Sequence, residues 1–314
     1  MIKRWLITLP LLLLPAASAL ADDQQERRGP PPQYTYYPLG SGALIGSEGS
    51  HAIQDGETLF SIARDHSLGF RELVAANPDL DAWQPEVGRT LRLPNRHLLP
   101  EAPREGIVVD LAQRRLFYFP PEGDQVLTWP VSIGQQGHDT PLGQTRVVRK
   151  RVDPTWVPPP SVREKFEDLP ASVPPGDSNP LGTRALDLGW PSYVIHGTNL
   201  AMGVGGSLSH GCVRMHNRDV EMLYELVETD ILVTVVDQPV RLGWYENGLW
   251  MQVSPDWDKL DARGRATDTG LPDRTLPMLQ LLELAGERTP ELDWDAIGAA
   301  LLSPHGSTVQ LLSP

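Results

Sequence analysis

The sequence predicts a mainly β protein with a small helical module near its N-terminus and a partly helical C-terminal tail. Short runs rich in β-branched and aromatic residues follow one another between Glu105 and Val236, and such runs are typical of strands. Apolar residues at three- and four-residue spacing, which indicate helices, occur mainly in residues 50–97 and after Leu271. The chain also contains 31 Pro among 314 residues, which favours loops and extended segments over a helical bundle.

Residues 1–21 are predicted to be a signal peptide. Lys3 and Arg4 precede an apolar run, and the small residues of Ala19–Ala21 follow it in an A-x-A pattern. The apolar run from 5 to 20 is shorter than the ~20 residues that span a bilayer, which disfavours a membrane anchor. We therefore expect a periplasmic protein, cut after Ala21 and without a stable membrane span in its mature form.

Residues 22–49 are expected to be a Pro/Gly-rich lead-in without regular elements, and residues 50–97 a compact module of two helices between strands. Thr58 is a candidate cap for the first helix, and Asn77-Pro78 is expected to end the second. The pieces GETLFSIAR, ANP and GRTLRLP resemble the LysM repeat. That resemblance implies binding to N-acetylglucosamine polymers such as peptidoglycan. The alternative is a small packing module without a ligand.

Residues 104–236 are expected to form the main β domain. A long Pro-rich insertion, 153–181, interrupts it. One helix follows Asn217, which is a candidate cap, with Val220, Leu223, Tyr224 and Val227 on one face. The predicted strands are Gly106–Asp110, Arg115–Phe119, Val126–Ile133, Thr145–Val152, Tyr193–His196 and Ile231–Val236.

The net charge of the chain argues against one class of function. A formal net charge of −13 argues against nucleic-acid binding, which needs clustered Lys and Arg. Residues 237–314 predict a further hairpin and two helical patches, and no role is assigned to them. No cofactor is expected.

Cys212 is the single cysteine of the chain and lies in the stretch SHGCVRMHN. Because it cannot pair within its own chain, it is an inert thiol, an intermolecular disulfide, a metal ligand or a reactive thiol. A reactive thiol needs a base to ionise it. His210 and His216 are nearest in sequence, and His196 ends a predicted strand upstream. If the strands bearing His196 and Cys212 are neighbours, these two residues meet side by side.

The pattern His196-Gly197, a small-residue loop and Ser-His-Gly-Cys-x-Arg resembles the signature of YkuD-type L,D-transpeptidases. The resemblance covers about residues 104–236, with further similarity at 139–143 and 179–182. The module order suggests the Gram-negative branch that attaches Braun's lipoprotein. The implied fold is β-sandwich-like, and the implied reaction is acyl transfer from a peptidoglycan tetrapeptide stem. A thioester forms, D-Ala leaves, and an amine then accepts the acyl group, giving a 3-3 crosslink or a lipoprotein attached through lysine.

The resemblance also implies a role for each residue of the motif. Cys212 is the expected nucleophile and His196 the general base. The remaining expected site residues are Gly197, whose carbonyl orients the ring; His210, which polarises the site; the N–H groups of Gly211 and Cys212, which form the oxyanion hole; and Arg214 and Ser209, which bind substrate.

Several alternatives stay open from the sequence. The acyl-enzyme could pass to water, giving an L,D-carboxypeptidase or a lipoprotein-releasing hydrolase, or the protein could be a non-catalytic peptidoglycan binder. Arg214 is alternatively a structural ion-pair partner, and 153–181 is a candidate lid. His216 is expected at the surface or at a helix start. The sharpest rival is a zinc site built from His196, His210, Cys212 and His216, although such sites usually contain more cysteines.

Overall fold

The structure is a computed structural model that describes residues 37–40, 42–78, 80–164, 168–260, 275–302 and 304–313. The predicted signal peptide and most of the lead-in lie outside these residues. Within the described ranges, none of the helices has the length and apolar character needed to cross a membrane.

The N-terminal module has the predicted order of strand, two helices and strand. Its elements are β3 (Gly49–Ala52), α2 (Leu59–Asp65), α3 (Phe70–Ala75) and β4 (Thr90–Leu93), and β3 pairs with β4 antiparallel. Thr58 caps α2 as predicted, because its hydroxyl accepts the Ser61 N–H at 3.0 Å. The core holds Leu59, Ile62, Leu73, Leu91 and other apolar side chains, all nearly inaccessible to solvent.

The expectation that 22–49 contains no regular element is wrong for its described part. β1 (Tyr37–Pro38) pairs with β8 (Gln125–Pro130), and β2 (Leu44–Gly46) pairs with β5 (Arg96–Leu98). These short strands are stabilised by partners far away in sequence, so local periodicity does not reveal them.

The main domain contains one nine-stranded sheet in the order β1-β8-β7-β6-β15-β10-β11-β12-β14. The predicted strands are confirmed, with shifted ends, except that 126–133 divides into β8 and β9. Strand β11 was not predicted and occupies a central place beside β10. The further strands are β6 (Gly106–Asp110), β7 (Arg115–Phe119), β9 (Ile133–Gly134), β10 (Gly143–Val152), β11 (Arg184–Leu188), β12 (Val194–His196), β13 (Ser207–Ser209), β14 (Val213–Arg214) and β15 (Leu232–Val236).

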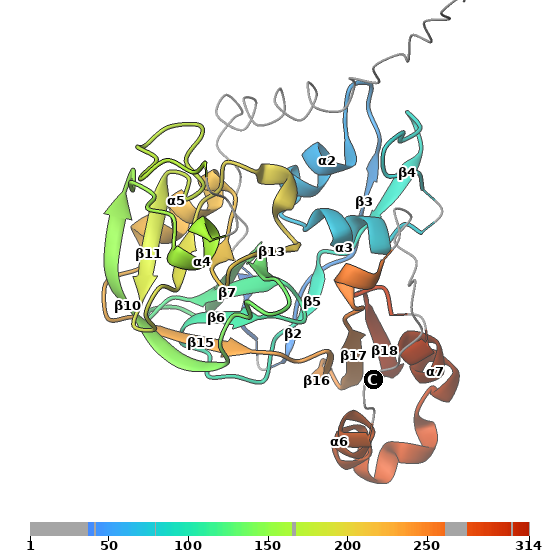
Figure 1. Cartoon of the computed structure of the whole chain (residues 1–314). Coiled ribbons are helices and arrows are strands. Elements are labelled where there is room, and N and C mark those ends of the chain that lie inside the picture. Colours follow the sequence, from blue (N-terminus) through green and yellow to red (C-terminus); the bar gives the residue numbers. More distant parts are fainter. Residues whose placement is uncertain are drawn as a thin grey trace, which may run out of the picture. The chain divides into compact units, whose positions relative to one another are not determined.

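The two halves of this sheet enclose one apolar core. Val109 and Trp129 from one half join Leu186, Ile195 and Val213 from the other in a single buried cluster. Helix α5 (Asn217–Leu226) packs on β11 and β12 and contributes Val220 and Leu223. Figure 1 shows β10 and β11 side by side with α5 close to them. The mainly β prediction is therefore confirmed.

The insertion 153–181 is held by a buried asparagine. The Asn179 amide donates to the carbonyl oxygens of Pro154 at 2.7 Å, Pro174 at 3.1 Å and Val173 at 3.2 Å. Trp156 and Val173 form an isolated β-bridge. A short helix, α4 (Pro160–Arg163), lies between them in sequence. The described part of the insertion is therefore organised around Asn179.

The C-terminal region folds as a three-stranded sheet with helices against it. The predicted hairpin is confirmed as β16 (Val240–Tyr245) and β17 (Gly248–Val253), and β18 (Thr308–Leu312) adds to β17. The two predicted helical patches are α6 (Thr275–Ala285) and α7 (Trp294–Leu302) (Figure 1). The 3₁₀ segments of the chain are Ala201–Gly203, Trp257–Lys259 and Gly286–Glu291.

Candidate active site

The histidine and cysteine segments lie on neighbouring strands, as the sequence suggested. β12 pairs with β14 in parallel, with Ile195 opposite Val213 and His196 opposite Arg214. Side chains alternate between the two faces of a strand. Ile195 and Val213 are in the core cluster beside α5, so His196, Cys212 and Arg214 share the opposite face of the sheet.

The His196 ring is buried and fixed by a backbone oxygen. Its exposed fraction is 3%, and its Nδ1 lies 2.5 Å from the Gly197 carbonyl oxygen. A carbonyl oxygen only accepts hydrogen bonds, so Nδ1 carries the proton and Nε2 keeps its lone pair. Burial, and next the positive charge of Arg214, lower the pKa of His196 to about 3. The ring is therefore neutral at pH 7, with a basic nitrogen available.

The Cys212 thiol is half-buried and protonated in the resting structure. It donates to the Ser192 carbonyl oxygen, with an Sγ–O distance of 3.6 Å. Burial raises the pKa of Cys212, and the Val194 N–H and the Arg214 charge oppose that rise. Ser192 has a φ of +71°, a left-handed conformation that is uncommon for serine.

The resting thiol and imidazole are expected to form a neutral pair, because the pKa of Cys212 is raised and that of His196 is lowered. The thiolate should then appear only at alkaline pH, above the ordinary thiol pKa of ~8.5. Since Cys212 is the only cysteine, the ultraviolet absorbance of its thiolate can be followed through a pH titration, with Cys212→Ala as the blank. A thiolate signal already present at pH 7 would contradict this prediction.

The turn before Cys212 is shaped by Ser209 and Gly211. The buried Ser209 hydroxyl accepts the Gly211 N–H at 3.1 Å and donates to the Cys212 carbonyl oxygen at 2.5 Å. Gly211 has a φ of +98°, and a Cβ there would lie 2.5 Å from the Tyr193 ring. Ser209 was expected to bind substrate, but here its hydrogen bonds are used within the turn. Of the two expected oxyanion donors, Gly211 N–H is occupied by Ser209.

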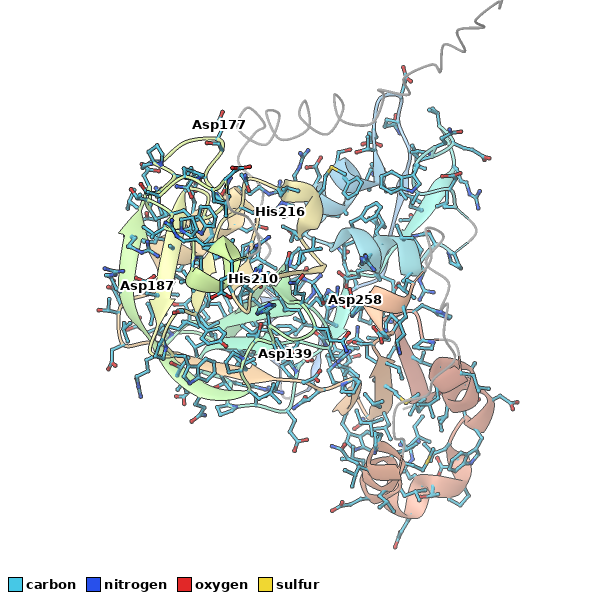
Figure 2. The ribbon with its side chains drawn as sticks, viewed as in Figure 1. Asp139, Asp177, Asp187, His210, His216 and Asp258 are labelled. Carbon is cyan, nitrogen blue, oxygen red and sulfur yellow. The ribbon has the colours of Figure 1, made fainter. Side chains whose placement is uncertain are left out.

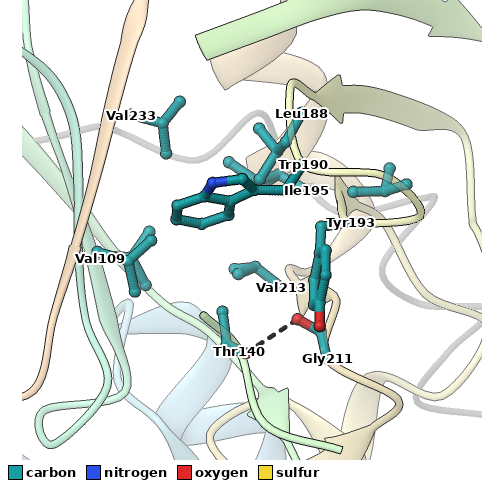
Figure 3. A pocket seen from close by; sticks show the side chains of 11 residues that line it. Val109, Thr140, Leu188, Trp190, Tyr193, Ile195, Gly211, Val213 and Val233 are labelled. Carbon is teal, nitrogen blue, oxygen red and sulfur yellow. Dashed lines mark hydrogen bonds between the residues drawn. The ribbon is translucent and has the colours of Figure 1, made fainter. Parts of the chain in front are cut away.

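Two residues that the sequence analysis did not single out support the same turn. Thr140 Oγ1 donates to the Gly211 carbonyl oxygen at 2.9 Å and accepts the Gly134 N–H at 3.0 Å. The His138 ring packs against the His210 ring, with centroids 4.4 Å apart. Figure 2 labels His210, and Figure 3 draws the Thr140–Gly211 bond. Thr140 lies in the stretch DTPLG, and the similarity of that stretch to the family was the feature of the sequence that could have indicated a role for Thr140.

Arg214 is a largely buried cation beside the thiol. Burial lowers the pKa of its guanidinium, and the electrostatic interaction with Cys212 opposes that shift. Among the described residues, no acidic side chain forms an ion pair with Arg214, and its buried Nε has no hydrogen-bond partner. The structural ion-pair alternative for Arg214 therefore has no partner in the described part of the chain.

The structure confirms the expected helix-start position of His216 and corrects the expectation that Asn217 caps the helix. His216 does precede α5, at the N-cap position, but it is 5% exposed and so does not lie at the surface. Asn217 does not cap the helix. Its amide instead donates to the Thr198 carbonyl oxygen at 2.9 Å and accepts the Thr198 N–H at 3.1 Å. Asn217 thereby ties the loop after His196 to α5.

The described residues do not form a metal site at Cys212. Across the described ranges, no group of three or more His, Cys, Asp or Glu side chains is placed to bind a metal ion. The zinc alternative therefore has no ligand set there.

The gap behind the turn is also not a ligand site. Val109, Val213 and Val233 line it with Trp190 and Tyr193, and it leaves no volume for a water molecule (Figure 3). It lies on the core face of the sheet, opposite Cys212. The candidate site is therefore on the opposite face of the sheet, which carries His196, Cys212 and Arg214.

Comparisons with known proteins identify the two domains that the chain contains in residues 51–242. Residues 104–242 match the L,D-transpeptidase catalytic domain named YkuD, and residues 51–94 match the LysM domain. The YkuD match extends past the expected domain end at 236.

The chain also resembles full-length relatives. It is 35% identical over 288 residues to Probable L,D-transpeptidase ErfK/SrfK of Escherichia coli (strain K12), covering 89% of this chain and 91% of that protein. It is 39% identical to Probable L,D-transpeptidase YcfS of the same strain, covering 67% of this chain and 68% of that protein. A solved structure, the Ldtfm-avibactam carbamoyl enzyme, is 23% identical with a TM-score of 0.36, covering 45% of this chain and 51% of that chain.

Identity at this level and over this share of the relatives establishes the family. The LysM match covers the N-terminal module, and the catalytic match covers the main β domain. The chain belongs to the YkuD-type L,D-transpeptidases, and it is an L,D-transpeptidase with a LysM domain.

Proposed function

We propose that this transpeptidase works through a thioester on Cys212. The observation that supports this most is the pairing of β12 with β14, which sets His196 and Cys212 on one face of the sheet. His196 Nδ1 is held by the Gly197 carbonyl oxygen, which leaves Nε2 to receive a proton. A base fixed in this way on the same face as a thiol fits the arrangement that nucleophilic catalysis needs.

The reaction then proceeds in two steps, formation of the thioester and transfer of its acyl group to an amine. His196 Nε2 takes the thiol proton as sulfur attacks the carbonyl of the third residue of a peptidoglycan tetrapeptide stem. The carbon–nitrogen bond to D-Ala breaks, and the imidazolium returns the proton to the leaving amine. An acceptor amine next attacks the thioester carbonyl, and the carbon–sulfur bond breaks. The proton that the amine loses passes through His196 Nε2 to the Cys212 thiolate.

The turn before Cys212 supplies the remaining parts. The Cys212 N–H has no hydrogen-bond acceptor among the described residues, so it is the proposed oxyanion donor. Ser209 is proposed to position this N–H by holding the turn through Gly211 and the Cys212 carbonyl oxygen. His210, packed on His138, polarises the site. Arg214, without an acidic partner among the described residues, binds a substrate carboxylate.

The acceptor and the compartment complete the proposal. The acceptor is the diaminopimelate amine of another stem, which gives a 3-3 crosslink, or a lipoprotein lysine. The insertion 153–181 is proposed as the lid that keeps water from the thioester. The LysM domain holds the enzyme at peptidoglycan, and the N-terminal 21 residues export it to the periplasm.

Incubation with disaccharide-tetrapeptides, read by mass spectrometry, tests the mechanism. The expected products are free D-Ala, a 3-3 crosslinked dimer and a thioester adduct on the protein. Cys212→Ala should abolish all three while leaving binding to peptidoglycan intact. Adding a lipoprotein C-terminal peptide shows whether lysine competes as acceptor. Release of D-Ala by Cys212→Ala at the wild-type rate would refute the thioester mechanism.

A further inference from the structure

The face of the catalytic sheet that carries the candidate site also carries a second group of charged side chains. The strand registers place Arg149 opposite Asp187, and Asp187 opposite Val194. In the next row, Arg151 lies opposite Ala185, and Ala185 opposite His196. Because β12 and β14 pair in parallel with His196 opposite Arg214, the register puts Val194 opposite Cys212. The row of Arg149, Asp187 and Val194 therefore leads to Cys212. The row of Arg151, Ala185 and His196 leads to Arg214.

Asp187 holds both arginines of this group in place. Its carboxylate accepts from Arg149 Nε at 2.5 Å and from Arg151 Nη2 at 2.7 Å. Asp187 and Arg151 are 15% and 24% exposed, whereas the Arg149 side chain is 67% exposed. The two guanidinium groups are thus fixed by one shared carboxylate, and one positive charge is left over.

The group is electrostatically coupled to the candidate site. The Asp187 charge raises the pKa of Cys212, although burial is the larger cause, and the Arg151 charge lowers it. Arg151 also lowers the pKa of His196, after burial and Arg214. With Arg214, the face carries three arginines against one aspartate, in a chain whose formal net charge is −13. A positive surface of this kind attracts anionic ligands.

We propose that Arg149 and Arg151, oriented by Asp187, form a second carboxylate subsite for the donor stem peptide. Guanidinium groups bind carboxylates through paired, charge-assisted hydrogen bonds. Arg151 keeps its Nε without a hydrogen-bond partner among the described residues. Arg149 presents the exposed end of the group to solvent. The subsite is separate from Arg214, which lies next to the thiol on β14.

The spacing of the strands indicates which carboxylate fits. Neighbouring strands lie ~4.8 Å apart, so three strand steps separate the backbone of Arg149 from that of Cys212 by about 14 Å. An extended peptide advances ~3.4 Å per residue, and long side chains on both sides shorten the span further. Only D-Ala follows the bond that is cut in a tetrapeptide, and one residue is too short to span this distance. We therefore infer that the ligand is a carboxylate of the same stem on the N-terminal side of that bond.

This inference rests on the proposed function, but it can be tested by binding alone. In a Cys212→Ala background, calorimetry would measure the affinity for two tetrapeptide stems that differ only at the second residue. One stem carries a free α-carboxylate there, and the other carries the amide. We expect Arg149→Gln/Arg151→Gln to weaken binding of the free-carboxylate stem about tenfold and to leave the amidated stem unchanged.

A matched control comes from the same strand. Arg146 lies on β10, is 54% exposed and pairs with Asp230 instead of Asp187, so Arg146→Gln should change neither affinity. If the double variant unfolds, Arg149→Gln alone serves, because its side chain is mostly exposed. Equal weakening of both stems, or no weakening of either, would overturn the subsite.

The same variants separate this proposal from the catalytic one. With Cys212 intact, the double variant should raise KM for the free-carboxylate stem about tenfold and change kcat little. Turnover by Cys212→Ala would refute the thioester mechanism and leave the binding result valid. If the double variant kept the wild-type difference between the two stems, the subsite would be refuted and the thioester mechanism would stand.

Discussion

Replacing His196 by alanine is expected to slow thioester formation by about 10² to 10⁴-fold, the usual contribution of a general base. The ring is neutral, with its pKa lowered to about 3, and Nδ1 is committed to the Gly197 carbonyl oxygen. Only Nε2 is then left to take the thiol proton. Without the ring, the thiol, whose pKa is raised by burial, stays protonated near neutral pH and attacks slowly.

The measurement is a single turnover with excess enzyme, followed by mass spectrometry of the protein. His196→Ala should retain the wild-type affinity for stem peptide in binding experiments while the thioester accumulates slowly. Raising the pH should recover part of the rate, because hydroxide replaces the missing base. His305→Ala, in the C-terminal region and outside the catalytic sheet, is the control and should leave the rate unchanged. A wild-type rate in His196→Ala would remove the base role from this residue.

His196 and Cys212 could be proposed from the sequence as the central site residues because their segments carry local information. Cys212 sits in a distinctive motif, and His196 ends a short apolar strand. The prediction that their strands are neighbours is confirmed by the β12–β14 pairing. Strands with clear runs of β-branched and aromatic residues, such as β6 and β7, were also predicted correctly.

The features that could not be predicted from the sequence depend on contacts between segments that are distant in the chain. β11 contains a short RALDL run, and its alternation was too brief to separate from the Pro-rich insertion before it. Without β11, Asp187 could not be placed between Arg149 and Val194. Asn217 was assigned as a cap from its residue type, but its amide binds the loop at Thr198 instead. The burial of His216 likewise follows from packing around the start of α5, which residue spacing does not reveal.

Asp110 and Arg241 form a buried ion pair that is expected to support the end of the catalytic domain. Arg241 Nη1 lies 3.2 Å from Asp110 Oδ2, and the side chains are 2% and 0% exposed. Asp110 also accepts the backbone N–H groups of Ala112 at 3.1 Å and Gln238 at 3.2 Å. Arg241 lies on β16, beyond the expected domain end at 236, and Asp110 ends β6 in the nine-stranded sheet.

Asp110→Ala is therefore expected to lower the free energy of unfolding by about 3–5 kcal/mol, since it leaves the Arg241 charge buried and unpaired. Denaturant unfolding measures the loss. The exposed pair of Arg146 with Asp230, 84% exposed at the aspartate, gives the control, and Asp230→Ala should cost less than about 1 kcal/mol. Equal losses for the two variants would contradict the prediction.

A double variant shows whether the loss of stability in Asp110→Ala comes from leaving the Arg241 charge unpaired or from losing a net stabilisation by the ion pair. Combining Asp110→Leu with Arg241→Met removes both charges together and fills the space with apolar groups. We expect this double variant to recover most of the stability that Asp110→Ala loses, because buried ion pairs often contribute little net free energy. Recovery would mean that the loss in Asp110→Ala comes mainly from the unpaired Arg241 charge, and that Asp110 and Arg241 act mainly to fix β16 against β6. A double variant as unstable as Asp110→Ala would instead show that the backbone hydrogen bonds to Asp110 carry the stability.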